Sequence, residues 1–141
     1  MIKLSITSWA EAQNLVKSLR NQVFVIEQKV PEDMEWDEFD QIAWHAIVTA
    51  DNQTIGTGRL IINDRIAKIG RMAVQSSRRN QGIGKSILKS LIQTAKEKGA
   101  QECILHAQTH AIAFYAKEDF EPHGPIFDEA GIPHVEMRLI L

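Results

Sequence analysis

The sequence contains one cysteine, Cys103, among its 141 residues. A single cysteine excludes an intramolecular disulfide and any multi-cysteine metal site. The formal net charge is −2 at pH 7, which gives no electrostatic basis for binding nucleic acid or an anionic membrane. No apolar run approaches the length of a membrane span, and no signal-peptide core follows Met1. We therefore expect a cytoplasmic protein that binds neither nucleic acid nor membrane.

The length and composition are those of one ordinary globular domain. Apolar residues make up 44% of the chain and charged residues 24%, so a hydrophobic core can form beneath a polar surface. A chain of this length is enough for one such core. We expect residues 1–141 to form a single domain.

Hydrophobic periodicity predicts the order β-α-β-β-β-α-β-α-β. The expected strands are residues 2–6, 43–50, 54–62, 65–74, 102–108 and 135–139, and the expected helices begin near residues 9, 83 and 110. Gly56 and Gly58, inside the third strand, are typical of a bulge or of close contact with another element. A strand–helix–strand crossover predicts that strand 102–108 is parallel to strand 65–74. The expected fold is α+β, with a mixed, mainly antiparallel sheet flanked by helices.

Two segments outside these elements carry distinct signals. Glycine and proline at residues 124, 125, 131 and 133 predict a structured loop before the last strand. Residues 31–40 are strongly acidic, which is typical of a solvated loop. The aromatic Trp36 and Phe39 within this acidic segment favour a second interpretation, a rim that attracts a cationic substrate.

Residues 78–86 form a basic loop with two glycines, followed by a strongly amphipathic helix. The glycines allow backbone N–H groups to approach a ligand, and the helix N-terminus favours an anion, most often a phosphate. A dinucleotide fingerprint would require a third glycine where Ile87 stands, and a P-loop would require glycine at Arg79. The remaining pattern is Arg/Gln-x-x-Gly-x-Gly/Ala, which runs here from Arg79 to Gly84.

This loop and a second motif resemble the GNAT superfamily of N-acetyltransferases. The second motif is Ala113-Phe114-Tyr115-Ala116-Lys117-Glu118-Asp119-Phe120. It departs from the superfamily signature at Asp119, where glycine is usual, and His110 replaces an asparagine common at the helix start. Residues 20–28, His45 and residues 131–137 further resemble a bacterial subgroup, the ElaA-like or YjcF-like acetyltransferases.

The resemblance implies that acetyl-CoA donates an acetyl group directly to the amine of a small molecule or peptide, in a ternary complex and without a metal. It also implies two sets of cofactor contacts, a strand end that pairs with pantetheine and a loop that holds the pyrophosphate. These residues are Met72, Ala73, Val74, Arg79, Asn80, Gln81, Gly82, Ile83, Gly84, Lys85 and Ser86. The N–H of Val74 is the expected oxyanion donor.

Tyr115 is the expected general acid, because a phenol is protonated at neutral pH. Glu27 and His134 are the first candidates for the general base, in a group that also includes His45 and His106. A structural role stays open for each of these side chains. A homodimer agrees with the superfamily, and a noncatalytic acyl-CoA-binding or sensing domain is the alternative function.

Overall fold

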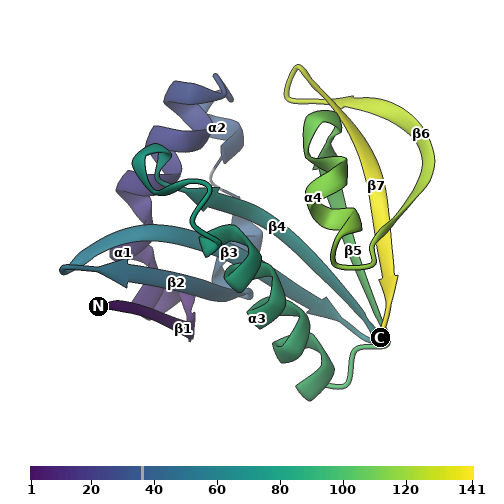
Figure 1. Ribbon diagram of the computed structural model, residues 1–141, viewed down its shortest axis with the longest axis horizontal. Helices are drawn as coiled ribbons and strands as arrows, with labels where there is room; N and C mark the ends of the chain where they lie inside the picture. The colour runs from purple at the N-terminus through teal and green to yellow at the C-terminus, as the bar shows by residue number, and fades with distance from the viewer. Residues whose placement is uncertain (36) are drawn as a thin grey trace.

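The structure is a computed structural model that describes residues 1–35 and 37–141 (Figure 1). Within these residues, seven strands form one sheet in the order β1-β2-β3-β4-β5-β7-β6. The strands are β1 (Ile2–Ser8), β2 (Trp44–Ala50), β3 (Gln53–Asn63), β4 (Ile66–Val74), β5 (Glu102–Gln108), β6 (Glu121–Glu129) and β7 (Ile132–Ile140). Neighbouring strands are antiparallel except β4 and β5, which are parallel as predicted. The predicted α+β fold class is confirmed.

Helices cover both faces of the sheet (Figure 1). The helical segments are α1 (Trp9–Arg20), the π-helical η1 (Asn21–Glu27), α2 (Glu32–Glu35), the short η2 (Glu38–Gln41) and η3 (Ser76–Arg78), α3 (Ile83–Glu97), η4 (Thr109–Ala111) and α4 (Ile112–Ala116). On one face, α1 packs Ala12 and Val16 against Ile47 of β2. On the other face, Ile87 and Leu91 of α3 join the largest apolar cluster. Each helix buries the stripe that its 3.6-residue periodicity places on one side.

The predicted loop before the last strand is wrong, because residues 121–129 form strand β6 at the edge of the sheet. Within the described residues, β6 pairs only with β7, and its register shifts between His123 and Phe127. An edge strand tolerates Pro122 and Pro125, since one side of the strand donates no ladder hydrogen bonds. The turn residues therefore mark an irregular strand, and the order gains a strand between α4 and β7.

Strands β4 and β5 diverge after a short parallel pairing. The pairing ends at Ile69 and Leu105. Directly afterwards β4 bulges: Gly70 pairs with Arg59 of β3 and Ala73 pairs with Thr57, so two β4 residues stand opposite one β3 residue. A bulge bends its strand and increases the local twist. It turns the end of β4 away from β5 and opens a gap in the middle of the sheet (Figure 1).

The interior glycine Gly58 allows α3 to lie close to β3, as the sequence predicted. A Cβ atom at residue 58 would lie 2.7 Å from Cγ2 of Ile87 and 2.9 Å from Cδ1 of Leu91. We expect Gly58→Ala to lower the free energy of unfolding by about 1–3 kcal/mol, because the helix must shift to accept the methyl group. Gly70→Ala is the matched control, since a Cβ there meets nothing within 4 Å. Equal denaturant midpoints for the two variants would contradict this account.

Candidate active site

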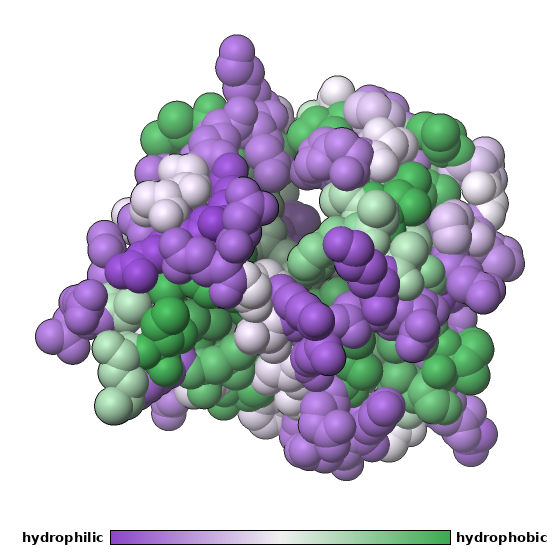
Figure 2. Space-filling view, viewed as in Figure 1, coloured by the Kyte–Doolittle hydropathy of each residue, from purple (hydrophilic) through white to green (hydrophobic). Residues whose placement is uncertain are grey.

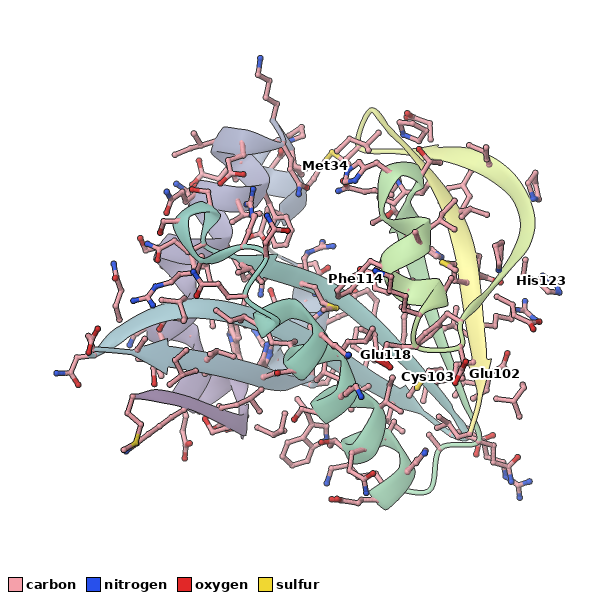
Figure 3. All side chains as sticks on the ribbon, in the orientation of Figure 1. Met34, Glu102, Cys103, Phe114, Glu118 and His123 are labelled. Carbon is pink, nitrogen blue, oxygen red and sulfur yellow. The ribbon has the colours of Figure 1, made fainter. Side chains whose placement is uncertain are left out.

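A cavity of about 480 Å³ lies where β4 and β5 diverge. One wall comes from η1, α2 and β3, and the opposite wall comes from β5, η4, α4 and the β6–β7 turn. Figure 2 shows the molecule hollowed between these two halves, and Met34 projects from α2 into the gap (Figure 3). The cavity therefore lies between segments that are far apart in the sequence.

The glycine loop lies at the start of α3, beside the end of β4. Gly82 is the N-cap residue of α3 with a left-handed φ of 81°, and a Cβ there would meet nothing within 4 Å. At Gly84, a Cβ would lie 3.4 Å from the Phe114 ring and 3.8 Å from Cγ2 of Val74. The first N–H groups of α3 point out of the helix end, where they and the helix dipole favour an anion. The loop thus joins an anion site to the strand end.

The backbone of Val74 faces the gap. The N–H of Gln75 donates to the carbonyl oxygen of Ile55 over 2.8 Å, so Gln75 faces β3. Because backbone groups alternate along a strand, the N–H and C=O of Val74 point the other way. Nε of Arg79 donates to that carbonyl oxygen over 3.0 Å. The end of β4 thus has a backbone edge that an extended ligand can pair with, as a further strand would.

Tyr115 lines the cavity from α4. Its hydroxyl lies 4.0 Å from Sδ of Met72, and its ring packs edge-on against Phe114 and Phe120 at centroid distances of 5.0 and 6.2 Å. Burial raises the pKa of Tyr115 to about 12, because the phenolate loses its hydration. Asp119, which replaces the signature glycine, takes the left-handed conformation with a φ of 70°, as expected of aspartate. The phenol is therefore fully protonated at neutral pH.

Two histidines and a glutamate line the same cavity. His134, 7% exposed, lies on β7, and its Nδ1 is 2.7 Å from the carbonyl oxygen of Ile132. Nε2 of His134 lies 3.6 Å from Oε2 of Glu129, and Nδ1 of His106 lies 3.0 Å from Oε1 of the same carboxylate. Glu129 comes from β6, where the sequence predicted a loop, so sequence analysis missed this residue. The strand pairing of β6 with β7 is what brings the three together.

The other candidate bases lie elsewhere. Oε2 of Glu27 lies 2.8 Å from Nη2 of Arg79, so its carboxylate is ion-paired beside the glycine loop and does not line the cavity. His45 is buried on β2, where Nε2 donates to the carbonyl oxygen of Asp40 over 2.9 Å. A general base must reach the proton that it removes. The structure therefore brings His134 together with Tyr115 at the cavity but places Glu27 and His45 outside it.

A hydrogen-bonded chain crosses the gap beside Tyr115. Nε2 of Gln108 at the end of β5 donates to Oε1 of Gln28 over 3.0 Å, and Nε2 of His110 donates to Oε1 of Gln108 over 2.8 Å. Gln28 and Gln108 are 80 residues apart in the sequence. This chain joins the two walls, and no local sequence signal marks it.

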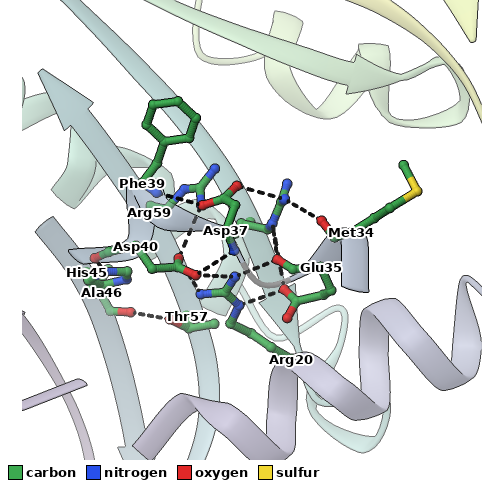
Figure 4. Close-up of polar contacts among 11 residues, drawn as sticks. Arg20, Met34, Glu35, Asp37, Phe39, Asp40, His45, Ala46, Thr57 and Arg59 are labelled. Atoms are coloured by element: carbon green, nitrogen blue, oxygen red, sulfur yellow. Dashed lines mark hydrogen bonds and ion pairs between the residues drawn. The ribbon is translucent and has the colours of Figure 1, made fainter. Parts of the chain in front are cut away.

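The acidic segment 31–40 folds back into the protein. Arg20 is 1% exposed, and its guanidinium bonds Oε1 of Glu35 and Oδ1 of Asp40, each over 2.8 Å (Figure 4). Burial raises the pKa of Glu35 above its ordinary value and outweighs the attraction of Arg20. Burial alone would also raise the pKa of Asp40, but the bonds and charges of Arg20 and Arg59 hold it below its ordinary value. The two pKa values shift in opposite directions because the two carboxylates have different partners. Within the described residues, Oε2 of Glu35 has no hydrogen bond.

Two further arginines complete this cluster. Nη1 of Arg59 lies 2.7 Å from Oδ1 of Asp37 and 3.1 Å from Oδ1 of Asp40 (Figure 4). Arg71, at the β4 bulge, lies 3.2 Å from Oδ2 of Asp37 and donates to the carbonyl oxygens of Met34 and Glu35. The solvated-loop interpretation is wrong for Glu35 and Asp40, which are 1% and 2% exposed, but Glu32, Asp33 and Glu38 are exposed as it predicted. The carboxylates of Glu35, Asp37 and Asp40 are paired with arginines, so they are not free to attract a cation. Trp36, which supported the second interpretation, lies outside the described residues.

A helix N-terminus, an open strand edge and a cavity lined by a partly buried phenol are the features that the resemblance to the GNAT class implied. The comparisons agree. A family model described as "Acetyltransferase (GNAT) domain" matches residues 10–141. The N-acetyltransferase YjcF of Bacillus subtilis (strain 168), itself uncharacterized, is 38% identical over 120 residues, which are 84% of this chain and 86% of that protein.

Solved structures show the same fold. An acyl-CoA N-acyltransferase from Pseudomonas aeruginosa superposes with a TM-score of 0.89 at 28% identity, covering 98% of this chain and 99% of that one. ElaA of Escherichia coli superposes with a TM-score of 0.89 at 24% identity, with the same coverage of 98% and 99%. The chain belongs to the GNAT acetyltransferase family, and its resemblance to the ElaA-like and YjcF-like branch is confirmed.

Two further findings concern the described residues as a set. None of their helices is both long and apolar enough to cross a membrane. Among the described residues, no group of three or more histidine, cysteine, aspartate or glutamate side chains is arranged to hold a metal ion.

Proposed function

We propose that the protein is an acetyl-CoA-dependent N-acetyltransferase that acetylates the amine of a small molecule or peptide. The observation that carries the proposal is the divergence of β4 from β5 directly beside the N-terminus of α3, with Tyr115 in the wall of the resulting cavity. This arrangement leads from an anion site, along a backbone edge, to an acid that is protonated at neutral pH. Family membership supports the reaction class.

The donor would occupy the path from α3 to the cavity. The backbone N–H groups of residues 81–84 would hold the pyrophosphate, and Lys85 with Arg79 would add positive charge. The pantetheine arm would pair with the backbone of residues 72–74, which brings its thioester beside Val74. Arg79 bonds the carbonyl oxygen of Val74 in the present structure, so it must release that oxygen when the arm pairs there.

The reaction needs a base for the amine, an oxyanion donor and an acid for the thiolate. We assign the base to His134 and not to Glu27, because His134 lines the cavity and Glu27 does not. The free amine attacks the thioester carbon, and the N–H of Val74 stabilises the resulting oxyanion. When the C–S bond breaks, the hydroxyl of Tyr115 gives its proton to the sulfur. The proton that the attacking nitrogen then loses passes to the phenolate and restores Tyr115. The products are an N-acetyl compound and CoA with a free thiol.

Thiol release from acetyl-CoA across a panel of amines tests this function directly. An N-acetyltransferase releases thiol only with particular acceptors, and the amount of thiol equals the amount of amide formed. The alternative, a noncatalytic acyl-CoA-binding domain, predicts a higher melting temperature with acetyl-CoA and no turnover with any amine. If acetyl-CoA does not change the melting temperature at all, the assigned donor site is wrong.

We expect Gly82→Leu to abolish stabilisation by acetyl-CoA. A side chain at residue 82 would occupy the open space where the pyrophosphate must approach the backbone. With acetyl-CoA at 100 times its Kd, the wild type gains about 2.7 kcal/mol, and the variant should lose nearly all of this gain. Gly99→Leu is the matched control, because Gly99 has a similar φ of 85° but lies at the other end of α3. Thermal melting with and without acetyl-CoA compares the two variants. Equal stabilisation of both by acetyl-CoA would contradict the assignment of the pyrophosphate site to Gly82.

A further inference from the structure

Glu129, the last residue of β6, lies beside two of the histidines that line the cavity, His106 and His134. One carboxylate oxygen lies 3.0 Å from Nδ1 of His106 on β5, and the other lies 3.6 Å from Nε2 of His134 on β7. The two histidines come from adjacent strands on the same face of the sheet, since Gln108 pairs with His134 and His106 pairs with Glu136. The carboxylate thus bridges two imidazoles at the wall of the proposed acceptor site.

The hydrogen bonds of His134 determine which nitrogen is free to act as a base. Its Nδ1 lies 2.7 Å from the carbonyl oxygen of Ile132, and a carbonyl oxygen only accepts hydrogen bonds. Nδ1 therefore carries the proton in the neutral ring, and Nε2 keeps its lone pair. Nε2 is the nitrogen that faces Glu129. When Nε2 takes a proton, the carboxylate 3.6 Å away lies within ion-pair distance of the imidazolium.

Ring packing holds both imidazoles in place. Phe127, two residues before Glu129 on β6, stacks on His134 with an interplanar angle of 22° and a centroid distance of 6.1 Å. The same ring meets His106 edge-on at 5.0 Å. Alternation along β6 places Phe127 and Glu129 on one face of the strand, so one ring and one carboxylate act on the same pair of histidines.

The second carboxylate near these rings is already neutralised. Oε1 of Glu136 lies 3.9 Å from Nε2 of His106, and Oε2 of Glu136 lies 2.8 Å from Nη2 of Arg138. Arg138 therefore balances Glu136. The His134 side chain is 8% exposed and that of Glu129 is 47% exposed, so Glu129 connects a buried base with water.

We propose that Glu129 is a positioning residue for the acetyl transfer, which stabilises the imidazolium form of His134 and passes its proton to solvent. This inference rests on the proposed function. The N–H bond of the acceptor ammonium breaks, its electron pair stays on nitrogen, and the proton moves to Nε2 of His134. The imidazolium then gives that proton to Glu129 and from there to water. The second proton that nitrogen loses passes to the phenolate of Tyr115 and replaces the proton given to sulfur, so one proton leaves per turnover.

Glu129→Gln tests this role, because glutamine keeps the size and one acceptor oxygen but not the charge. We expect kcat to fall by about 10- to 100-fold, part of the 10²- to 10⁴-fold that general acid–base catalysis supplies. The KM for acetyl-CoA and the melting temperature should not change. The defect should shrink at alkaline pH, where the acceptor amine is already deprotonated in solution and needs no base.

Asp128→Asn is the matched control, since it removes the same charge from the neighbouring residue, whose side chain lies on the other face of β6. Its kcat should equal that of the wild type. A kcat of Glu129→Gln within about twofold of the wild type would overturn the inference and leave the proposed function standing. So would a loss that comes with an equal loss of acetyl-CoA stabilisation, because that result indicates a purely structural role. Absence of thiol release by the wild type with every amine would overturn the proposed function and this inference together.

Discussion

Tyr115→Phe is expected to lower thiol release from acetyl-CoA by roughly 10²-fold or more, the lower bound for loss of a general acid. The substitution removes one oxygen atom and leaves the ring, which packs between Phe114 and Phe120, in place. The lost hydroxyl lies 4.0 Å from Met72, at the strand end where the thioester would lie. Without it, the thiolate must leave unprotonated. Steady-state kinetics measure this decrease, with an amine that supports thiol release by the wild type.

The loss should appear in kcat, with little change in the KM for acetyl-CoA or in the melting temperature. Thr94→Val is the control for removal of a hydroxyl, because Thr94 bonds the carbonyl oxygen of Ser90 within α3, away from the cavity. A decrease of less than about threefold in Tyr115→Phe would sink the role of Tyr115 as the acid. Tyr115 is the only tyrosine of the chain, so ultraviolet titration of its phenolate reports the pKa of about 12 directly.

Arg20→Met is expected to lower the free energy of unfolding by about 3–5 kcal/mol, which is typical of breaking a buried ion pair from one side. Methionine keeps an unbranched apolar stem but leaves the buried Glu35 and Asp40 without the guanidinium that bonds them both. Arg59 still bonds Asp40, and among the described residues the carboxylate of Glu35 keeps Arg71 at 3.7 Å. Urea denaturation measures the difference.

The cost of Arg20→Met comes from the charge left behind, so adding Glu35→Gln should recover part of the lost stability. The pKa of Asp40 is held below its ordinary value, so the stabilisation from this carboxylate is present at neutral pH and is lost as pH falls through its folded pKa. The penalty of Arg20→Met should therefore diminish in acid. Arg78→Met serves as the control, because its contact with Asp51 is 3.9 Å long and exposed, and such pairs contribute about 0–1 kcal/mol. A loss below about 1 kcal/mol in Arg20→Met would mean that the cluster does not stabilise the fold.

Elements formed from contiguous residues were predicted well. Strand 102–108 was predicted with the bounds that the structure gives it, and helix α3 begins at Ile83 as expected. Both patterns are local, since the two-residue period of a strand and the 3.6-residue period of a helix can be recognised within a short segment. Strand β6 was missed because Gly124 and Pro125 indicated a loop, and only its pairing with β7 shows that these residues lie in an edge strand.

Charged residues were harder to interpret, because their partners are far away in the chain. The carboxylates of residues 31–40 were expected in solvent or at a rim, yet Arg59 and Arg71 reach Asp37 from β3 and β4. Glu27 was a candidate base, but Arg79, which is 52 residues away in the chain, binds its carboxylate. A sequence pattern shows which charges exist, whereas burial and pairing depend on which strands and helices meet.

The sequence by itself specified the proposed donor site, because that site is built from one stretch, residues 72–86, whose strand end, glycines and helix start follow one another. The proposed acceptor side depends on the tertiary structure alone. A bulge at Arg71 opens the sheet, and the groups that meet in the gap come from η1, β5, α4, β6 and β7. No short interval of the sequence contains them together, since Glu129, His106 and Tyr115 line one cavity only when the strands pair and α4 packs beside them.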